Sequence, residues 1–331
     1  MKFIVDAMGG DNCPNAAVKG VVQAIRAKEG FDIILVGDKK LINTILDAED
    51  CHDKRITIID APTYVDMADN PVKVLKQKRD ASMFKCMDLL KEGQGDLMIS
   101  AGSTGALLVG SSIILGRIKG INSPSMPASI PNRTGGFTLL LDSGLNPVIK
   151  PDNYVQFAKI GSVYYNVLTG APNPKVGLLN MGTENSKGNQ VVKEAFEELM
   201  DANVNFAGNI ESGDILKGHV QVVVCDGFTG NCVIKAIEGT AKMLTGMLRG
   251  IFEKSVKNKA AYVVIKGDMT EMKRTMNTDE SAGAPILGVN GLVIKTHGNS
   301  KDTTFASVIL KKAMLLSDSR IVERLTREFA K

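Results

Sequence analysis

The strongest constraint on the fold is a regular alternation of short apolar runs with longer amphipathic stretches. The runs are rich in β-branched residues and are continuously hydrophobic, which is typical of parallel strands covered by helices on both faces. They are expected to form strands at residues 2–8, 32–38, 55–61, 96–102, 138–144, 176–182, 204–209, 220–227 and 291–298. The alternation predicts an α/β fold with a largely parallel sheet.

Four of the intervening stretches carry recognisable helix signals. Helices are predicted at 71–92, 151–168, 189–201 and 302–316. Pro71 suits a first helical turn, because its missing N–H would have no partner there. Gly93 and Gly170 follow the first two helices and suit the left-handed residue that often ends a helix.

The length of 331 residues exceeds the roughly 250–300 residues at which a single core stops growing. One large domain with an appended subregion and two closely joined lobes both fit this length. We take the chain as a single α/β/α domain over 1–331. Within it, 1–230 and 280–331 are expected to supply the main sheet and helices, and 231–279 a long amphipathic helix with a helical tip.

Composition and charge exclude several functions. The chain has 40 basic and 36 acidic residues, only 5% aromatic residues and no Trp. It therefore has neither the positive electrostatic field nor the aromatic surface for base stacking that is typical of a nucleic-acid-binding protein. No apolar run approaches the ~18 residues of a membrane-spanning helix, and the first residues lack a signal-peptide pattern. A cytoplasmic location is expected.

The sequence also lacks the motifs of metal and nucleotide sites. Its five Cys and three His residues are scattered, without the spacing of a zinc site or a disulfide framework. Neither a dinucleotide fingerprint, a P-loop nor a nucleophile elbow is present. We therefore expect no cofactor and no metal ion.

At least six of the apolar runs end in a polar, glycine-rich turn just before a helix. In open α/β sheets, ligands bind outside the carboxyl ends of the strands, at a topological switch point. Glycine lets the backbone approach an anion there, and a helix start offers free N–H groups. These turns predict a phosphate or substrate site at Asp6, Gly9, Gly10, Asp11, Gly102, Ser103, Thr104, Gly105, Asn189, Asp226 and Gly227. The alternative is that the glycines only permit tight turns.

Two further side chains in these turns are candidates for catalysis. Lys187 precedes Gly188 and the helix start at Asn189, which suits a clamp for phosphate or for an oxyanion. His297 ends a strand just before another glycine turn, where an imidazole could donate to phosphate or protonate a leaving group. For Lys187 the alternative is a solvated lysine, and for His297 a structural histidine.

Several motifs, in order along nearly the whole chain, are similar to those of one known family. They are VDAMGGD (5–11), SAGSTGALL (100–108), GRIKGI (116–121), LLNMGTENSKGN (178–189), AGN (207–209), DGFTGN (226–231) and GAPILGVNGLVIKTHGNS (283–300). The chain resembles the bacterial phosphate acyltransferases of phospholipid synthesis, the PlsX family. It departs from their pattern at Ser103, where Asn is usual, at Leu145, where Ala is usual, and at Thr183, where an acidic residue is usual.

The resemblance implies a reaction, a fold and partners. A long-chain acyl group would pass from the thioester of acyl carrier protein to inorganic phosphate, giving acyl phosphate. The fold would be a Rossmann-like α/β/α sandwich, working as a homodimer. A membrane-associated glycerol-phosphate acyltransferase would take the product. The alternatives are a phosphotransacetylase-like enzyme using coenzyme A thioesters, and a non-catalytic acyl-binding protein.

The resemblance also bears on two neighbouring residues. It raises Asn231, otherwise an ordinary helix cap, to a catalytic candidate beside Lys187 and His297. Cys232 could form an acyl-cysteine intermediate if a helix start lowered its pKa, but the resemblance implies no nucleophilic cysteine at this position.

The segment 231–257 combines an apolar stripe with a basic one. The apolar positions recur at helical spacing and include Leu244 and Leu248, whereas Lys235, Lys242 and Arg249 recur every seven residues. The resemblance supports a protruding helical element whose surface meets acyl carrier protein or an anionic membrane. The alternative is a helix that packs against a second copy of the chain. Its glycines suggest close packing against another element.

Overall fold

The computed structural model describes residues 1–276 and 283–330. The chain divides into two compact units, each built around its own sheet. Unit 1 comprises Met1–Pro127, Lys159–Pro172 and Ser281–Lys331, and unit 2 comprises Ala128–Ala158 and Asn173–Glu280. Two sheets form where a single main sheet was expected, because an apolar run indicates that a strand forms but not which other strand it pairs with.

The sheet of unit 1 has six strands in the order β10-β11-β4-β1-β2-β3. Their bounds are β1 Lys2–Asp6, β2 Asp32–Gly37, β3 Ile56–Asp60, β4 Leu97–Ser100, β10 Ala284–Ile286 and β11 Leu292–Lys295. Five strands are parallel, and β10 joins the edge antiparallel to β11. The chain proceeds from β1 to β2 and β3, then returns to β4 on the other side of β1. The switch point therefore lies between β1 and β4.

Helices pack on the sheet of unit 1. They are α1 Asn15–Ala27, α2 Lys39–Ala48, α3 Pro71–Gln77, α4 Ser82–Lys91, α5 Thr104–Gly110, α10 Asp302–Ser307, α11 Met314–Ser319 and α12 Ile321–Phe329, with π-helical turns at Ser111–Leu115 and Val308–Ala313. The helix predicted at 302–316 is thus confirmed as a continuous helical segment with a π-helical turn inside it. Gly93 has the expected positive φ.

The helix predicted at 71–92 is interrupted, and this prediction was wrong in its middle. The structure ends α3 at Gln77 and begins α4 at Ser82. The amide of Ser82 donates to the carbonyl of Thr63 instead of to a helical partner, and its hydroxyl reaches Asp6. Long-range hydrogen bonds, which local pattern cannot reveal, decide where α4 starts.

The sheet of unit 2 has five strands in the order β5-β6-β9-β7-β8. The elements are β5 Ala128–Pro131, β6 Phe137–Leu141, α6 Pro151–Thr169, β7 Val176–Leu179, α7 Gln190–Asp201, β8 Phe206–Ile210, a 3-10 turn Ser212–Lys217, β9 Val222–Val224, α8 Gly227–Glu253 and α9 Val256–Met276. Four strands are parallel and β5 is antiparallel at the edge. The second part of α6, from Lys159, belongs to unit 1.

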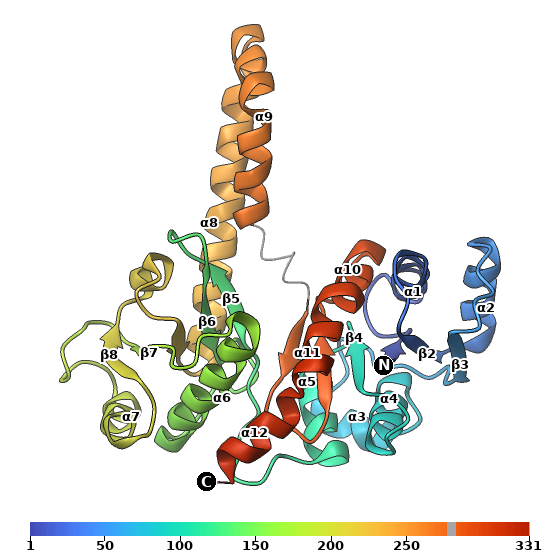
Figure 1. The fold of residues 1–331 in the computed structure, drawn as a ribbon, viewed down its shortest axis with the longest axis horizontal. Helices are drawn as coiled ribbons and strands as arrows, with labels where there is room; N and C mark the ends of the chain where they lie inside the picture. The colour runs from blue at the N-terminus through green and yellow to red at the C-terminus, as the bar shows by residue number, and fades with distance from the viewer. Residues whose placement is uncertain (277–282, 331) are drawn as a thin grey trace. The chain divides into compact units, whose positions relative to one another are not determined.

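The long helix of unit 2 begins earlier than predicted. Asp226 caps α8 by accepting from the amide of Thr229 at 2.8 Å, so Asn231 lies inside the helix rather than at its start. The base of α8 packs through Val233, Ile234 and Ile237 on buried residues of the sheet. Beyond this base, α8 and α9 run side by side as a helical hairpin (Figure 1).

All nine predicted strands form, with ends shifted by a few residues. The strands that the sequence missed are β5 and β10. Both are short antiparallel edge strands, of four and three residues, and each contains a proline. Strands this short carry too little periodicity to be recognised, and proline is tolerated only at a sheet edge.

Gly230, near the start of α8, tests how closely this helix packs on the backbone that follows β6. A Cβ at Gly230 would overlap the backbone carbonyl oxygen of Asp142. Gly230→Ala is therefore expected to lower the free energy of unfolding by about 1–3 kcal/mol, measured by urea denaturation. The control is Gly239→Ala in the same helix, where an added Cβ meets no atom within 4 Å and should stabilise by about 0.5–1 kcal/mol. Equal stability of the two variants would contradict the packing.

Candidate functional site

The turn after β1 is organised by the carboxylate of Asp6, which has no exposed surface. Its Oδ1 accepts from the Ser82 hydroxyl at 2.6 Å and from the amides of Met8 and Gly9 at 3.2 Å, and its Oδ2 accepts from the Ser100 hydroxyl at 2.7 Å. Burial raises the pKa of Asp6, and the hydrogen bonds from Ser100 and Ser82 oppose that rise. Asp6 therefore braces the turn from beneath and does not face solvent, so we assign it no direct contact with phosphate.

The turns after β1 and β4 lie in close contact above this carboxylate. The Ser100 hydroxyl that donates to Asp6 also accepts from the amide of Gly102 at 3.0 Å. A Cβ at Gly9 would overlap Asp6 Oδ2 and lie 2.9 Å from the amide nitrogen of Gly102. Gly9 is thus needed for the close approach of two strand-end turns at the switch point.

The turn after β11 also contacts the turn after β1. The amide of Asp11 donates to the carbonyl of Gly298 at 2.7 Å. Gly10 has φ of +112°, and a Cβ there would lie 2.8 Å from the Cβ of Ala101 and 2.9 Å from the carbonyl oxygen of Gly298. The turns at the carboxyl ends of β1, β4 and β11 therefore contact one another. His297 is exposed beside this contact.

A lysine that the sequence analysis overlooked lies at the end of β11. Lys295 is buried, and its Nζ donates to the carbonyl of Thr296. Burial lowers the pKa of Lys295 to about 8, while the negative charge of Asp11 raises it. The signal in the sequence was a lysine within an otherwise apolar strand.

The remaining predicted residues of unit 1 begin α5. Ser103 occupies the N-cap position without a side-chain capping bond, and Thr104 is the first helical residue. A Cβ at Gly105 would lie 2.6 Å from Cγ of Pro71, so this glycine allows α3 and α5 to touch. Gly105 therefore has a packing role that accounts for it without a ligand.

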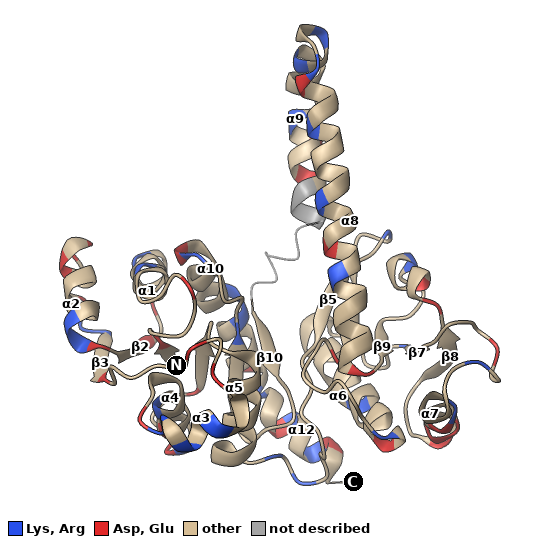
Figure 2. Ribbon diagram, turned by 180° about the vertical axis from the view of Figure 1, so that it is seen from behind, with Lys and Arg blue, Asp and Glu red and all other residues tan. Residues whose placement is uncertain are grey.

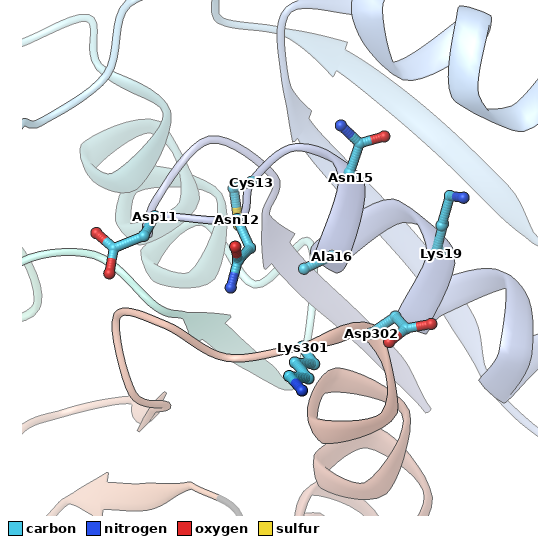
Figure 3. Close-up of a pocket in the computed structure, with 8 residues that line it drawn as sticks. All are labelled: Asp11, Asn12, Cys13, Asn15, Ala16, Lys19, Lys301 and Asp302. Carbon is cyan, nitrogen blue, oxygen red and sulfur yellow. The ribbon is translucent and has the colours of Figure 1, made fainter.

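An open hollow lies beside these turns, between the starts of α1 and α10. It has a volume of ≈ 560 Å³ and is lined by Asp11, Asn12, Cys13, Asn15, Ala16, Lys19, Lys301 and Asp302 (Figure 3). Its lysines and aspartates balance in number. Two of these charged side chains already have partners in the protein. Lys19 forms an ion pair with Glu49 at 3.1 Å, and Asp302 accepts a hydrogen bond from Gln23 at 2.7 Å.

Unit 2 repeats the arrangement of a buried aspartate under a glycine turn. Asp142 follows β6, has no exposed surface, and accepts through Oδ2 from the amides of Leu145 at 3.0 Å and Asn146 at 2.6 Å. A Cβ at Gly227 would lie 2.8 Å from the same Oδ2. The turns after β6 and β9 are therefore held together as those after β1 and β4 are. Asp226 lies in the turn after β9, where its side chain caps α8.

Lys187 lies in the loop between β7 and α7. A Cβ at Gly182 would lie 3.2 Å from Cγ of Lys187, so the lysine stem crosses this glycine. The side chain of Asn180 donates to the carbonyl of Lys187 at 3.1 Å. Gly188 has φ of +94°, and the side chain of Asn189 caps α7, which confirms the predicted helix start. Lys187 itself is exposed.

Asn231 faces the turn after β6. A Cβ at Gly144 would lie 3.5 Å from the Cβ of Asn231. The exposed Cys232 is its neighbour on α8, whereas Cys225 is buried, and burial raises the pKa of Cys225 well above its usual value. Cys225 is thus a packing residue.

Two negative findings concern the described part of the chain. Among residues 1–276 and 283–330, no group of three or more His, Cys, Asp or Glu side chains could hold a metal ion. None of the described helices combines the length and the apolar character needed to cross a bilayer.

Comparison with known proteins identifies the family. A family model described as a fatty acid synthesis protein matches residues 1–323. The phosphate acyltransferase of Acetivibrio thermocellus is 44% identical over 329 residues, which cover 99% of this chain and 96% of that protein. The chain belongs to the phosphate acyltransferase family. The phosphate acyltransferase of Clostridioides difficile is 38% identical over 331 residues, covering 100% of this chain and 97% of its own.

Solved structures confirm the fold of this acyltransferase. A phosphotransacetylase from Streptococcus pyogenes aligns with a TM-score of 0.64 at 19% identity, over 98% of this chain and 94% of its own. A branched-chain phosphotransacylase from Enterococcus faecalis aligns with a TM-score of 0.57 at 15% identity, over 98% of this chain and 99% of its own. At these identities the likeness establishes the shared α/β architecture.

The acyltransferase thus carries its predicted residues in two sets. Unit 1 brings together Asp6, Gly9, Gly10, Asp11 and Gly102 with His297 nearby along the same sheet edge. Unit 2 places Lys187, Asn189, Asp226, Gly227 and Asn231 at the carboxyl ends of its parallel strands. The sequence analysis missed Ser82 and Lys295 and did not single out Asp142. Nothing near Ser82 in the sequence marks it, because its role depends on a strand 76 residues away.

The brace in unit 1 of the acyltransferase can be tested with two serines. Ser100→Ala removes a donor to the buried Asp6 and an acceptor for Gly102, so it is expected to lower the free energy of unfolding by about 1.5–3 kcal/mol. Its control is Ser111→Ala, a fully buried serine whose Oγ has no hydrogen-bond partner in the part of the chain that the structure describes and whose loss should cost nothing. Denaturant titration of both variants measures the difference, and equal losses would contradict the bracing role.

Proposed function

We propose that this chain transfers a long-chain acyl group from the thioester of acyl carrier protein to inorganic phosphate, giving acyl phosphate for phospholipid synthesis. The observation that carries the proposal is the full-length similarity, at 44% and 38% identity, to proteins named phosphate acyltransferase. The description of the family model, a fatty acid synthesis protein, supports an acyl substrate drawn from fatty acid synthesis.

The chemistry needs no cofactor from the protein. A phosphate oxygen attacks the thioester carbonyl carbon and forms the C–O bond of a tetrahedral intermediate. The C–S bond then breaks, and the thiolate leaves and takes up a proton. Thioester and acyl phosphate are both activated acyl donors, and phosphate near neutral pH is already an anionic nucleophile. The protein must therefore mainly position the reactants and stabilise the oxyanion.

The residues of unit 2 suit stabilisation of the oxyanion. Lys187 is an exposed cation whose stem crosses Gly182, and whose backbone carbonyl is fixed by Asn180. Asn231 faces Gly144 in the turn that Asp142 braces. We assign Lys187 and Asn231 to the developing negative charge on the carbonyl oxygen. An ammonium and a carboxamide both donate hydrogen bonds to such an oxygen.

His297 is the candidate for protonating the leaving sulfur. It is exposed and follows β11, next to the contact between Gly298 and Asp11. An imidazole is the usual group for proton transfer near neutral pH. Cys232, which is also exposed, marks the covalent alternative, in which an acyl-cysteine forms first. Full activity of Cys232→Ala would eliminate that route.

Replacing Lys187 tests the assignment of the oxyanion stabiliser. Lys187→Met is expected to lower kcat by about 100- to 1000-fold, the usual effect of losing one oxyanion donor. The matched control is Lys193→Met, an exposed lysine on α7, which should keep its activity. Acyl phosphate formed from palmitoyl carrier protein and phosphate is the measured product. A kcat for Lys187→Met within threefold of the unaltered protein would contradict the role.

The donor can be identified by offering three thioesters with phosphate: palmitoyl carrier protein, palmitoyl coenzyme A and acetyl coenzyme A. The proposal expects acyl phosphate from the palmitoyl carrier protein at the highest kcat/KM. Product only from acetyl coenzyme A would instead favour a phosphotransacetylase-like activity. Absence of product from all three would favour an acyl-binding protein without catalysis.

The helical hairpin of α8 and α9 suits contact with a partner. Large apolar side chains are exposed along α8, namely Met243, Leu244, Met247 and Ile251, and Leu248 is half-buried. Figure 2 shows Lys and Arg positions, in blue, along both helices. We propose that this surface includes the contact of a homodimer, and that its basic residues receive acyl carrier protein or the anionic inner face of the plasma membrane. Delivery of acyl phosphate to a membrane-bound glycerol-phosphate acyltransferase would suit such a location.

The basic residues of α8 are not equally available. Lys235 pairs with Glu238 at 3.0 Å, and Arg249 pairs with Glu253 at 2.7 Å. The double change Lys242→Glu with Arg249→Glu is expected to weaken binding to acidic carrier protein or to anionic vesicles at low salt by about tenfold or more. Lys39→Glu with Lys40→Glu on α2 alters the net charge equally and serves as the control. Unchanged binding to both partners by the α8 variant would refute the basic surface.

A further inference from the structure

Lys295 is a buried lysine, and a buried ammonium group normally requires an anionic partner. It ends β11, in register with Ser100 at the end of β4, and only 9% of it is exposed. The hydrogen bond found for its Nζ goes to a neutral acceptor, the carbonyl of Thr296. Among residues 1–276 and 283–330, no carboxylate forms an ion pair with it, and Asp11 acts only through its field. Buried charges in proteins are normally paired with an opposite charge.

Two hydroxyls in the chain segment directly after Lys295 also lack a partner in the described part of the chain. Thr296 and Ser300 are almost wholly buried, and Oγ1 of Thr296 and Oγ of Ser300 have no hydrogen-bond partner among the described residues. Both belong to the turn that follows β11 and reaches the Gly10–Asp11 turn through Gly298. Buried hydroxyls left without a partner are unusual and call for an explanation. An oxyanion is one ligand able to accept from an ammonium and from hydroxyls alike.

The location favours phosphate as that oxyanion. The carboxyl ends of β1, β4 and β11 meet here, beside the switch point between β1 and β4, which is where open α/β sheets bind ligands. We propose that Lys295 binds the inorganic phosphate substrate at the carboxyl end of β11. This assignment rests on the proposed function, since it takes phosphate to be the acyl acceptor. It gives Lys295 a part in holding the nucleophile.

The test is direct binding of inorganic phosphate to the full chain in the absence of any acyl donor, measured by equilibrium dialysis. Lys295→Met is expected to lower the affinity for phosphate by about 10- to 100-fold, the effect of losing one hydrogen bond to a charged group. Lys295→Arg keeps the charge and should stay within about threefold of the unaltered protein. Lys311→Met removes an exposed lysine of unit 1 and should bind phosphate normally.

Steady-state kinetics separates a binding role from a structural one. With Lys295→Met, the KM for phosphate should rise about tenfold or more, while the KM for the acyl thioester stays within twofold. Methionine fits a buried site, and replacement of a buried charge by an apolar side chain is often neutral for stability, so an unchanged melting temperature is expected. If Lys295→Met does not fold, the phosphate affinity of Lys295→Arg is compared with that of Lys311→Met. An affinity of Lys295→Arg more than tenfold lower than that of Lys311→Met would then overturn the proposal.

Three further outcomes overturn the assignment. Unchanged phosphate affinity of a folded Lys295→Met would remove Lys295 from the phosphate site. An equal rise in both KM values would indicate a structural role. Weaker binding of coenzyme A with unchanged binding of inorganic phosphate would show that the anion is the phosphate of the donor's pantetheine arm. Because binding is measured without a donor, the proposal can hold or fail whether or not acyl phosphate forms.

Discussion

The structure depends on two buried carboxylates at the carboxyl ends of parallel strands, Asp6 as the last residue of β1 and Asp142 directly after β6. Asp6 accepts from two serine hydroxyls and from the amides of the turn after β1. Asp142 accepts from the amides of the turn after β6 and from the side chain of Asn146. A buried carboxylate is costly unless its oxygens are hydrogen-bonded. The requirement to satisfy these oxygens therefore fixes the course of the backbone at both strand ends.

The glycines of the strand-end turns follow from this constraint. Gly9 and Gly227 lie so close to the two carboxylates that an added Cβ would collide with an Oδ2 atom or with neighbouring backbone. The predicted phosphate-binding motifs are thus partly structural, because their glycines and aspartates first serve to bring neighbouring turns together. What remains for the substrate is the set of side chains that these rigid turns display. In our account these side chains are His297 and Lys295 in unit 1 and Lys187 and Asn231 in unit 2.

Much of this could be predicted from the sequence because it is locally encoded. The nine apolar runs and the cap at Asn189 depend on neighbouring residues, and the turns were identified by their glycines. The division into two sheets could not be predicted, because strand pairing joins segments such as β4 and β11 that lie far apart in the chain. The start of α4 depends on Ser82 reaching Asp6, and the start of α8 on the choice of Asp226 over Asn231 as its cap. Lys295 was overlooked because a lysine in a strand is usually exposed, and only the packed structure shows that this one is not.

The central claim is that turns at the carboxyl ends of parallel strands, braced by buried aspartates, bind the phosphate that accepts the acyl group. A crystal structure of the full chain with inorganic phosphate tests this most directly. The account predicts a tetrahedral anion at the carboxyl ends of the parallel strands of unit 1, with Lys295 among its donors. Phosphate bound with full occupancy elsewhere, with these turns unchanged and without a ligand, would contradict it.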